Sequence, residues 1–298
     1  MLMTRIVSAI ALAVTAGAAT ATDWYVDMNA APNGDGQGWG SAYQDIQPAL
    51  TAAQSGHTIW VKDGTYTPIA RMDNAAITIQ SMNGPSATII DGGGTNRCAM
   101  LGILSTHTAI VLSGFTLTNG NAAGSQGGGS CSGTLTNCVL TGNTANNGGG
   151  ADGGILIDCV LTGNMAGNNG GGAHNSTLTG CVLTGNTASN DGGGSYFCTL
   201  TGCVLTGNTA RNGGGSYGDT LTGCILSGNT ASNRGGGARS SVLENCLVTG
   251  NTAAEGGGAY DSPVRNCTVA GNTATGSVGG GGTWGGQSYN NIIWPDSQ

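Results

Sequence analysis

The chain has 298 residues, among them 58 glycines, eight lysines and arginines, and 15 aspartates and glutamates, for a formal net charge of −7. Such an acidic chain is a poor partner for nucleic acid or anionic membranes, so we expect neither kind of binding. Charged residues make up only 8% of the sequence, so solubility must come from threonine, asparagine, serine and glycine.

Residues 1–21 have the features of a signal peptide. Arg5 gives the positive n-region, residues 6–16 form a short apolar run, and Ala19-Thr-Ala21 is an A-x-A cleavage site. The apolar run is too short to span a bilayer, and no later segment is long and apolar enough, so we expect no transmembrane segment. The sequence therefore predicts a protein that is secreted or displayed on the cell surface.

Residues 22–57 are predicted to form an N-terminal cap. Tyr25–Asp27 has the composition of a short strand, and a short helix is expected over Asp45–Ala53 with Asp45 as its N-cap. Pro48 is tolerated there because it lies in the first helical turn. The loop over residues 33–36 (NGDG) offers oxygen ligands for calcium but lacks the acidic groups of a dedicated site. We predict no cofactor and no metal.

Residues 58–298 are predicted to form a β-helix. Three β-rich segments come first, at Thr58–Lys62, Ile77–Gln80 and Ala87–Ile90, and regular repeats begin at about residue 110. Cysteines mark the repeats at intervals of 21 or 22 residues: Cys138, Cys159, Cys181, Cys203, Cys224, Cys246 and Cys267. A fixed period of this length without a helical signature is typical of a solenoid, in which each turn packs against its neighbours.

Alternation within each repeat predicts which side chains face inward. Leu178, Cys181 and Leu183 share one face and the threonines between them share the other. The Gly-Gly-Gly tract that follows, as at residues 192–194, makes a tight corner. We therefore predict an all-β, right-handed, single-stranded parallel β-helix of about ten turns, with three strands and three corners per turn and the N-terminal helix as a cap. At about 4.8 Å per turn its length is about 50 Å.

Two columns of buried side chains follow from the period. Asparagines recur in step with the cysteines and should hydrogen-bond from turn to turn: Asn143, Asn164, Asn186, Asn208, Asn229, Asn251 and Asn272. The repeat cysteines should stack inside the rod as free thiols, because parallel in-register side chains set a disulfide torsion poorly. Cys98, Cys131 and Cys198 lie off this column. Because an exported protein meets an oxidising environment, a disulfide between two of them is an alternative.

Several segments carry a family resemblance. They are Asp23–Asp27 (DWYVD), Gly56–Tyr66 (GHTIWVKDGTY), Asn83–Gly92 (NGPSATIIDG) and Leu112–Gly120 (LSGFTLTNG), followed by the glycine-rich repeats. The chain resembles secreted bacterial right-handed β-helix proteins of the pectin-lyase-like superfamily, and its repeats are similar to those of chlamydial polymorphic outer-membrane proteins, which are surface adhesins. This resemblance implies the fold. It leaves the activity open, because the superfamily includes lyases, hydrolases and adhesins.

The second residue after each glycine tract varies while its surroundings stay fixed. These residues should line one edge of the rod: Cys131, Asp152, His174, Tyr196, Tyr217, Arg239, Tyr260 and Trp284. Aromatic side chains offer flat apolar faces with polar tips, which suit stacking on sugars or docking a protein. The candidate binding residues are therefore Tyr196, Tyr217, Arg239, Tyr260 and Trp284. The structural alternative is that these side chains only cover a glycine corner.

The function we predict is non-catalytic binding or adhesion to a glycan or a cell-surface protein. The main alternative is a polysaccharide lyase or glycoside hydrolase, for which Asp152, His174 and Tyr196 are the candidate acid/base group. Against it, the acidic residues are mostly alone in their turns, without the paired carboxylates of glycosidic hydrolysis. A minor alternative is ice binding through outward Thr-x-Thr rows, at residues 134–136, 177–179, 199–201 and 220–222.

The C-terminal end of the predicted rod raises a separate question. Only four residues follow Trp294, so we expect no cap on the last turn. An open sheet edge invites pairing with another chain. There are three alternatives for this open edge: the protein self-associates at this end, the last turn protects its own edge, or the chain is part of a longer protein.

Overall fold

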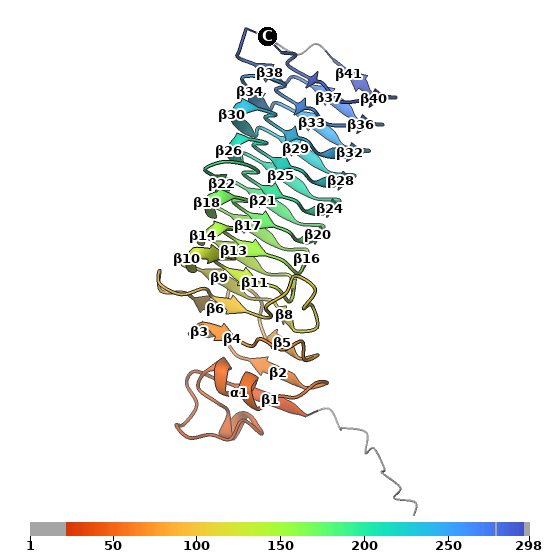
Figure 1. Cartoon of the computed structure of the whole chain (residues 1–298). Coiled ribbons are helices and arrows are strands. Elements are labelled where there is room, and N and C mark those ends of the chain that lie inside the picture. Colours follow the sequence, from red (N-terminus) through yellow and green to blue (C-terminus); the bar gives the residue numbers. More distant parts are fainter. Residues whose placement is uncertain (1–21, 278, 295–298) are drawn as a thin grey trace, which may run out of the picture.

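The computed structural model describes residues 22–277 and 279–294, and the predicted signal peptide lies outside them. The described chain forms a parallel β-solenoid of about 11 turns with one short N-terminal α-helix. The turns are stacked along a rod, from β1 (Asp23–Val26) at one end to β41 (Ile292–Ile293) at the other (Figure 1). The predicted all-β solenoid is confirmed.

The strands of the described residues form four sheets, which the chain visits in the order A, B, D and C. Sheet A consists of β1, β2 (Thr58–Val61), β5 (Thr78–Ser81), β8 (Val111–Ser113), β12 (Thr134–Thr136), β16 (Ile155–Ile157), β20 (Thr177–Thr179), β24 (Thr199–Thr201), β28 (Thr220–Thr222), β32 (Val242–Glu244), β36 (Val264–Arg265) and β40 (Ser288–Tyr289). Sheet B consists of β3 (Gly64–Tyr66), β6 (Thr88–Asp91), β9 (Thr116–Thr118), β13 (Val139–Thr141), β17 (Val160–Thr162), β21 (Val182–Thr184), β25 (Val204–Thr206), β29 (Ile225–Ser227), β33 (Leu247–Thr249), β37 (Thr268–Ala270) and β41.

The remaining two sheets lie on either side of the glycine tracts. Sheet D, which precedes each tract, consists of β10 (Asn121–Gln126), β14 (Thr144–Asn147), β18 (Met165–Asn169), β22 (Thr187–Ala188), β26 (Thr209–Asn212), β30 (Thr230–Arg234), β34 (Thr252–Ala253) and β38 (Thr273–Ala274). Sheet C, which follows each tract, consists of β4 (Ile69–Ala70), β7 (Ala99–Met100), β11 (Ser130–Cys131), β15 (Ala151–Asp152), β19 (Ala173–His174), β23 (Ser195–Tyr196), β27 (Ser216–Tyr217), β31 (Ala238–Arg239), β35 (Ala259–Tyr260) and β39 (Thr283–Trp284).

A regular turn of the structure therefore has four strands, and the prediction of three strands per turn is wrong. The alternating pattern locates only the strands of sheets A and B. The strands of sheet D are as short as two residues, and the strand of sheet C is two residues long in every turn. Two residues are too few to show an alternating pattern, so the sequence shows only a corner there. This short strand matters because it carries the variable position.

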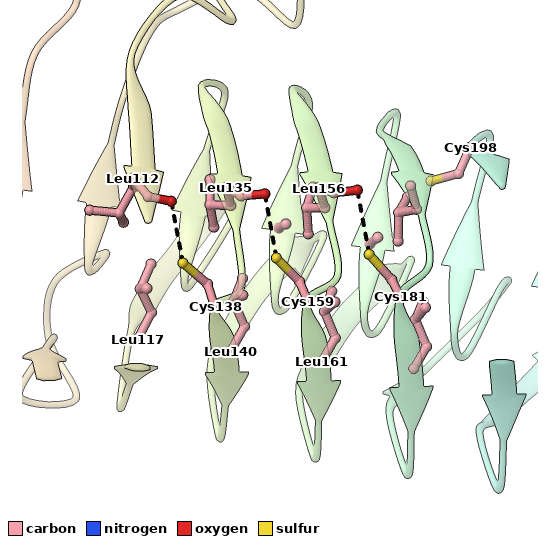
Figure 2. Close-up of a cluster of buried hydrophobic side chains, with 14 of the residues drawn as sticks. Leu112, Leu117, Leu135, Cys138, Leu140, Leu156, Cys159, Leu161, Cys181 and Cys198 are labelled. Carbon is pink, nitrogen blue, oxygen red and sulfur yellow. Dashed lines mark hydrogen bonds between the residues drawn. The ribbon is translucent and has the colours of Figure 1, made fainter. Parts of the chain in front are cut away.

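The interior is filled by the columns of leucine and cysteine that alternation predicts. Leu178, Cys181 and Leu183 are fully buried. The column thiols from Cys138 to Cys246 donate to a leucine carbonyl of the preceding turn, as from Cys181 Sγ to Leu156 O at 3.4 Å (Figure 2). The neighbouring Cys159 thiol and burial raise the pKa of Cys181 to about 12. The thiol of Cys181 therefore stays protonated and acts as a small apolar side chain.

All ten cysteines lie among the described residues and are free thiols. Nine of them are buried, and Cys131 is half-buried. Burial holds the pKa of Cys198 well above its ordinary value, and it raises the pKa of Cys98 to about 12.

The predicted asparagine ladder is confirmed. Asn186 Nδ2 donates to Asn208 Oδ1 of the next turn at 3.0 Å and to Leu161 O of the preceding turn at 2.9 Å. The same Asn208 oxygen accepts from the Asn186 backbone N–H at 2.9 Å. Since these side chains are buried, each amide satisfies backbone groups at the corner between sheets B and D and ties neighbouring turns together.

The predicted cap helix is also confirmed, as α1 (Ile46–Ala52). Asp45 is its N-cap and accepts from the Ile46 N–H at 2.8 Å. Ile46, Ala49 and Leu50 are buried, so the helix covers the apolar end of the first turns. No helix within the described residues is long and apolar enough to cross a membrane.

Candidate functional site

The variable residues form one column on sheet C. In-register pairing places Cys131 beside Asp152, Asp152 beside His174, and His174 beside Tyr196. The same pairing continues through Tyr217, Arg239, Tyr260 and Trp284. The expected arrangement of one variable residue per turn along one edge is therefore confirmed.

Asp152 and His174 form a hydrogen-bonded pair. Asp152 Oδ1 and His174 Nδ1 are 2.5 Å apart, and the two residues are only 9% and 8% exposed. Tyr196 stacks on the imidazole with ring centroids 5.5 Å apart and an interplanar angle of 13°. The three predicted acid/base candidates are thus brought together, as neighbours in consecutive turns.

The rings of the column stack on one another. Tyr196 and Tyr217 have centroids 5.2 Å apart at an interplanar angle of 14°. Tyr196 therefore has His174 on one face and Tyr217 on the other. The guanidinium of Arg239 lies 5.4 Å from the Tyr217 ring centroid and 5.8 Å from that of Tyr260. The side chains from His174 to Tyr260 therefore form one continuous stack of aromatic rings and a guanidinium group.

This stacking corrects the expectation that the tyrosines offer free flat faces. Parallel in-register strands place identical positions about 4.8 Å apart, which is close to ring-stacking distance, so neighbouring rings cover one another. Tyr196, between His174 and Tyr217, offers its edge and hydroxyl to a ligand and no free face. Trp284, in the last turn of sheet C, is 41% exposed.

Phe197 is a functional candidate that the sequence reasoning missed. It is 54% exposed and has a φ of 49°, in the left-handed region that bulky residues rarely adopt. Its ring packs edge-on against Tyr196 at 4.4 Å and against Tyr217 at 6.4 Å between centroids. A Cβ on Gly218 would lie 2.4 Å from Phe197 Cε1. The ring therefore requires the glycine beneath it.

A signal for Phe197 exists in the sequence. The residue after each variable position is otherwise small or polar: Ser132, Gly153, Asn175, Gly218, Ser240, Asp261 and Gly285. Such residues suit the positive φ that this corner has in every one of those turns. Phe197 breaks this pattern, and it is one of only two phenylalanines in the chain.

We call the surface formed by His174, Tyr196, Phe197, Tyr217, Arg239 and Tyr260 the aromatic ridge. Beneath it lies Asp219, which is 2% exposed. Its carboxylate accepts from Ser195 Oγ at 2.6 Å and from the Cys198 N–H at 2.6 Å. These donors stand on either side of Tyr196 and Phe197, so one buried carboxylate holds both ends of the dipeptide. Burial raises the pKa of Asp219 to about 7.

Asp219 also departs from its repeat. Serine occupies the equivalent position at Ser176, Ser241 and Ser262, and each hydroxyl bonds to the carbonyl two residues earlier. In the sequence, Asp219 looks like one more isolated acid. It lies two residues after the variable position, and only the three-dimensional path of the corner shows that this position faces inward.

A polar column runs along the other side of the glycine tracts, at the ends of the sheet D strands. In it, Asn212 Nδ2 donates to Asp191 Oδ1 at 2.8 Å, and Arg234 Nε pairs with Glu255 Oε2 at 3.0 Å. Arg234 also lies 4.9 Å from the Tyr260 ring centroid. Burial and the charge of Asp191 raise the pKa of Tyr196. The polar column is therefore close enough to the ridge to affect it.

The catalytic alternative finds only part of its requirements at this site. The Asp152–His174 pair joins a carboxylate and an imidazole by a hydrogen bond. Its neighbour Cys131 is no activated nucleophile, because burial raises the pKa of its thiol. Among residues 22–277 and 279–294, no group of three or more His, Cys, Asp or Glu side chains is placed to hold a metal ion. In the loop considered for calcium, Asp35 Oδ1 accepts from Ser41 Oγ at 2.6 Å and from the Gln37 N–H at 3.1 Å.

The Thr-x-Thr rows form an exposed array on sheet A. Thr199 and Thr201 pair in register with the rows at 177–179 and 220–222, and all six threonines are exposed. The array is bounded by Ile155–Ile157 on one side and Val242–Glu244 on the other. The fourth row, at residues 134–136, lies beyond Ile155–Ile157, and ice binding through these rows stays a prediction.

Comparison with solved structures finds β-helix proteins of low sequence identity. A pectate lyase is 13% identical with a TM-score of 0.48, over 92% of this chain and 79% of that one. A rhamnogalacturonan lyase is 11% identical with a TM-score of 0.48, over 92% and 87%. The Dettilon tailspike protein is 12% identical with a TM-score of 0.40, over 92% and 62%.

These similarities concern the fold. The β-helix is shared by lyases, hydrolases, tailspikes and epimerases, so it establishes no specific function. No protein-family model matches the chain, and no curated protein matches it.

Proposed function

We propose that this protein is an exported, non-catalytic binding or adhesion scaffold, and that the aromatic ridge is its binding surface. Export is supported by the leader-like sequence of residues 1–21. The partners we consider are a glycan and a cell-surface protein. The solenoid presents the ridge on a rigid rod, which suits a protein that holds a partner at a distance.

The observation that carries this proposal is the conformation of Phe197. An exposed aromatic ring at a φ of 49° adds little to the core and carries backbone strain. Asparagine or serine fills the same corner in other turns, at Asn175 and Ser240, without that cost. A residue whose role is only to cover the glycine corner has no need of Phe197, whereas a binding surface gains an apolar contact from it.

The composition of the ridge also favours binding. Tyrosine and arginine are enriched where proteins form their strongest contacts, and rings fixed by stacking lose little side-chain entropy on binding. The stack fixes Tyr196 and Tyr217, and Asp219 fixes the backbone between Ser195 and Cys198. The ridge is therefore organised before any partner arrives.

The experiment is a binding screen of the mature chain, residues 22–298, on a glycan array and on a panel of cell-surface proteins. We expect Phe197→Asn, which installs the residue found at position 175, to weaken binding at least about tenfold while the fold is retained. Met165→Thr is the matched control, because Met165 is 51% exposed on sheet D between Thr144 and Thr187. Equal loss in both variants, or no loss in Phe197→Asn, contradicts the proposal.

Catalysis on a polysaccharide is the second candidate, and the 2.5 Å contact between Asp152 and His174 favours it. A group that abstracts or donates a proton needs such an orienting partner. The test is product release from a panel of neutral and acidic polysaccharides. Turnover by the wild type that is lost in Asp152→Ala or His174→Ala replaces the binding proposal with an enzymatic one.

A further inference from the structure

We propose that Arg239 is the anchor of the aromatic ridge for a carboxylate, and that the partner is a protein segment carrying an acidic and an apolar side chain about 10 Å apart. The apolar side chain contacts Phe197 and the carboxylate binds Arg239. This inference rests on the proposed function of the ridge and names the chemistry of its partner.

The first argument is that Arg239 lacks an acidic partner. Within the described residues its guanidinium has no hydrogen bond or ion pair, and its Nε is buried without a partner. Lys62, Arg71 and Arg234 form ion pairs, as Lys62 does with Asp27 at 2.8 Å and Arg234 with Glu255 at 3.0 Å, and among the described arginines only Arg239 has a buried guanidinium nitrogen without a partner. A partly buried guanidinium left without an acceptor is costly, and a carboxylate that reaches its two terminal nitrogens, which are not buried, pairs with it best.

The second argument is the local charge. The whole chain carries a formal net charge of −7 with only eight basic residues, yet three of these lie in two adjacent turns: Arg211 and Arg234 on the paired sheet D strands β26 and β30, and Arg239 on β31 of sheet C. Glu255 offsets Arg234, and Asp219 is buried beneath the ridge with its oxygens hydrogen-bonded. Arg239 is therefore the cation that the ridge itself presents, between the rings of Tyr217 and Tyr260, and it complements an acidic partner.

The third argument concerns the class of partner. A sugar ring stacks on an open aromatic face, and both faces of Tyr196 are covered, by His174 and Tyr217. The ridge offers ring edges, hydroxyls, one projecting phenyl ring and one guanidinium, which are the contacts that a protein surface accommodates in pockets. These features favour a protein partner over a glycan.

The geometry sets the spacing in the partner. Tyr196–Phe197, Tyr217 and Arg239 belong to three consecutive turns, paired in register. Two turns of a parallel solenoid are about 10 Å apart along the rod axis. Tyr217 lies between the two contact points, with the guanidinium of Arg239 5.4 Å from its ring centroid. A partner that reaches both points therefore crosses the Tyr217 edge.

The experiment pans a displayed library of random linear peptides against the wild-type mature chain and measures the affinities of the selected peptides. We expect Asp or Glu to be enriched, and we expect both Arg239→Gln and the peptide's own Glu→Gln to weaken binding about tenfold. The two changes together should weaken it no further, since they remove the same contact. Arg265→Gln, an exposed arginine on sheet A, is the matched control and should bind as the wild type does.

Three results overturn the inference. They are peptides selected without acidic enrichment, affinity that is unchanged in Arg239→Gln, and binding to acidic glycans with no peptide selected. If the affinity depends on Phe197 and not on Arg239, Arg239 is not the anchor, and the ridge remains the proposed binding surface. Affinity that depends on neither residue removes the proposed function as well, so the two failures are distinguishable.

Discussion

Replacing Asp219 by asparagine should abolish a pH dependence of stability that the wild-type protein shows. Burial raises the pKa of this carboxyl from 3.8 to about 7 in the folded state. The folded protein therefore binds this proton more tightly than the unfolded chain does. The stabilising contribution is complete below the unfolded pKa of 3.8 and is lost as the pH rises through about 7.

The size of the effect follows from the two pKa values. One pKa unit corresponds to about 1.4 kcal/mol, so the rise from 3.8 to about 7 is worth about 4 kcal/mol of unfolding free energy. The hydrogen bonds from Ser195 Oγ and the Cys198 N–H favour the charged carboxylate and are opposed by its desolvation. Asparagine keeps an acceptor for the Cys198 N–H and has no proton to lose in this range.

The assay is urea unfolding of the wild type and Asp219→Asn at about pH 4 and about pH 8 under reversible conditions. The wild type should lose stability relative to the variant by up to about 4 kcal/mol between these pH values. Comparing the two proteins cancels the opposite contribution of carboxylates such as Asp27, whose pKa is lowered by Lys62. A difference between the proteins that is the same at both pH values refutes the reasoning.

Three further predictions concern the ladders and the ridge. Asn208→Ala should cost at least about 3 kcal/mol in urea unfolding, because it leaves the buried side-chain amide and backbone N–H of Asn186 without their shared acceptor; a smaller loss means that the ladder contributes little. Gly218→Ala should lower the unfolding free energy by about 1–3 kcal/mol through its clash with Phe197 and its positive φ. In the Phe197→Asn background, the stability cost of Gly218→Ala should be smaller. An equal cost in the wild-type and Phe197→Asn backgrounds contradicts the contact between residues 197 and 218. Alkylation of the native protein followed by mass spectrometry should modify Cys131 before the nine buried thiols, and rapid labelling of the interior thiols contradicts their burial.

The sequence is sufficient to predict the solenoid because its period is strict. Repeated Leu-x-x-Cys-x-Leu spacing predicts the buried column, and the asparagines in step with it predict the ladder that the structure shows. The variable position is visible as the break in an otherwise fixed repeat. In-register pairing then brings Asp152, His174 and Tyr196 into consecutive turns, as the spacing requires.

The other features of the fold and the site depend on distances between side chains, which the spacing of residues in the repeat does not give. The sheet C strand is too short to alternate, so the sequence does not show it as a strand. The stacking of Tyr196 between His174 and Tyr217 needs the separation between turns, which converts free ring faces into edges. Asp219 and Phe197 are single departures from the repeat, and their meaning appears only when the corner places the carboxylate beneath the ring.

Hydrogen exchange of residues 22–298, measured with and without the tightest-binding partner, tests most directly whether the aromatic ridge is the binding surface. We predict added protection in the amides of the ridge segments at residues 195–198, 217–219 and 238–241, with little change in the threonine array of sheet A. Protection confined to that array or to the N-terminal turns, with the ridge amides exchanging as in the free protein, contradicts this account.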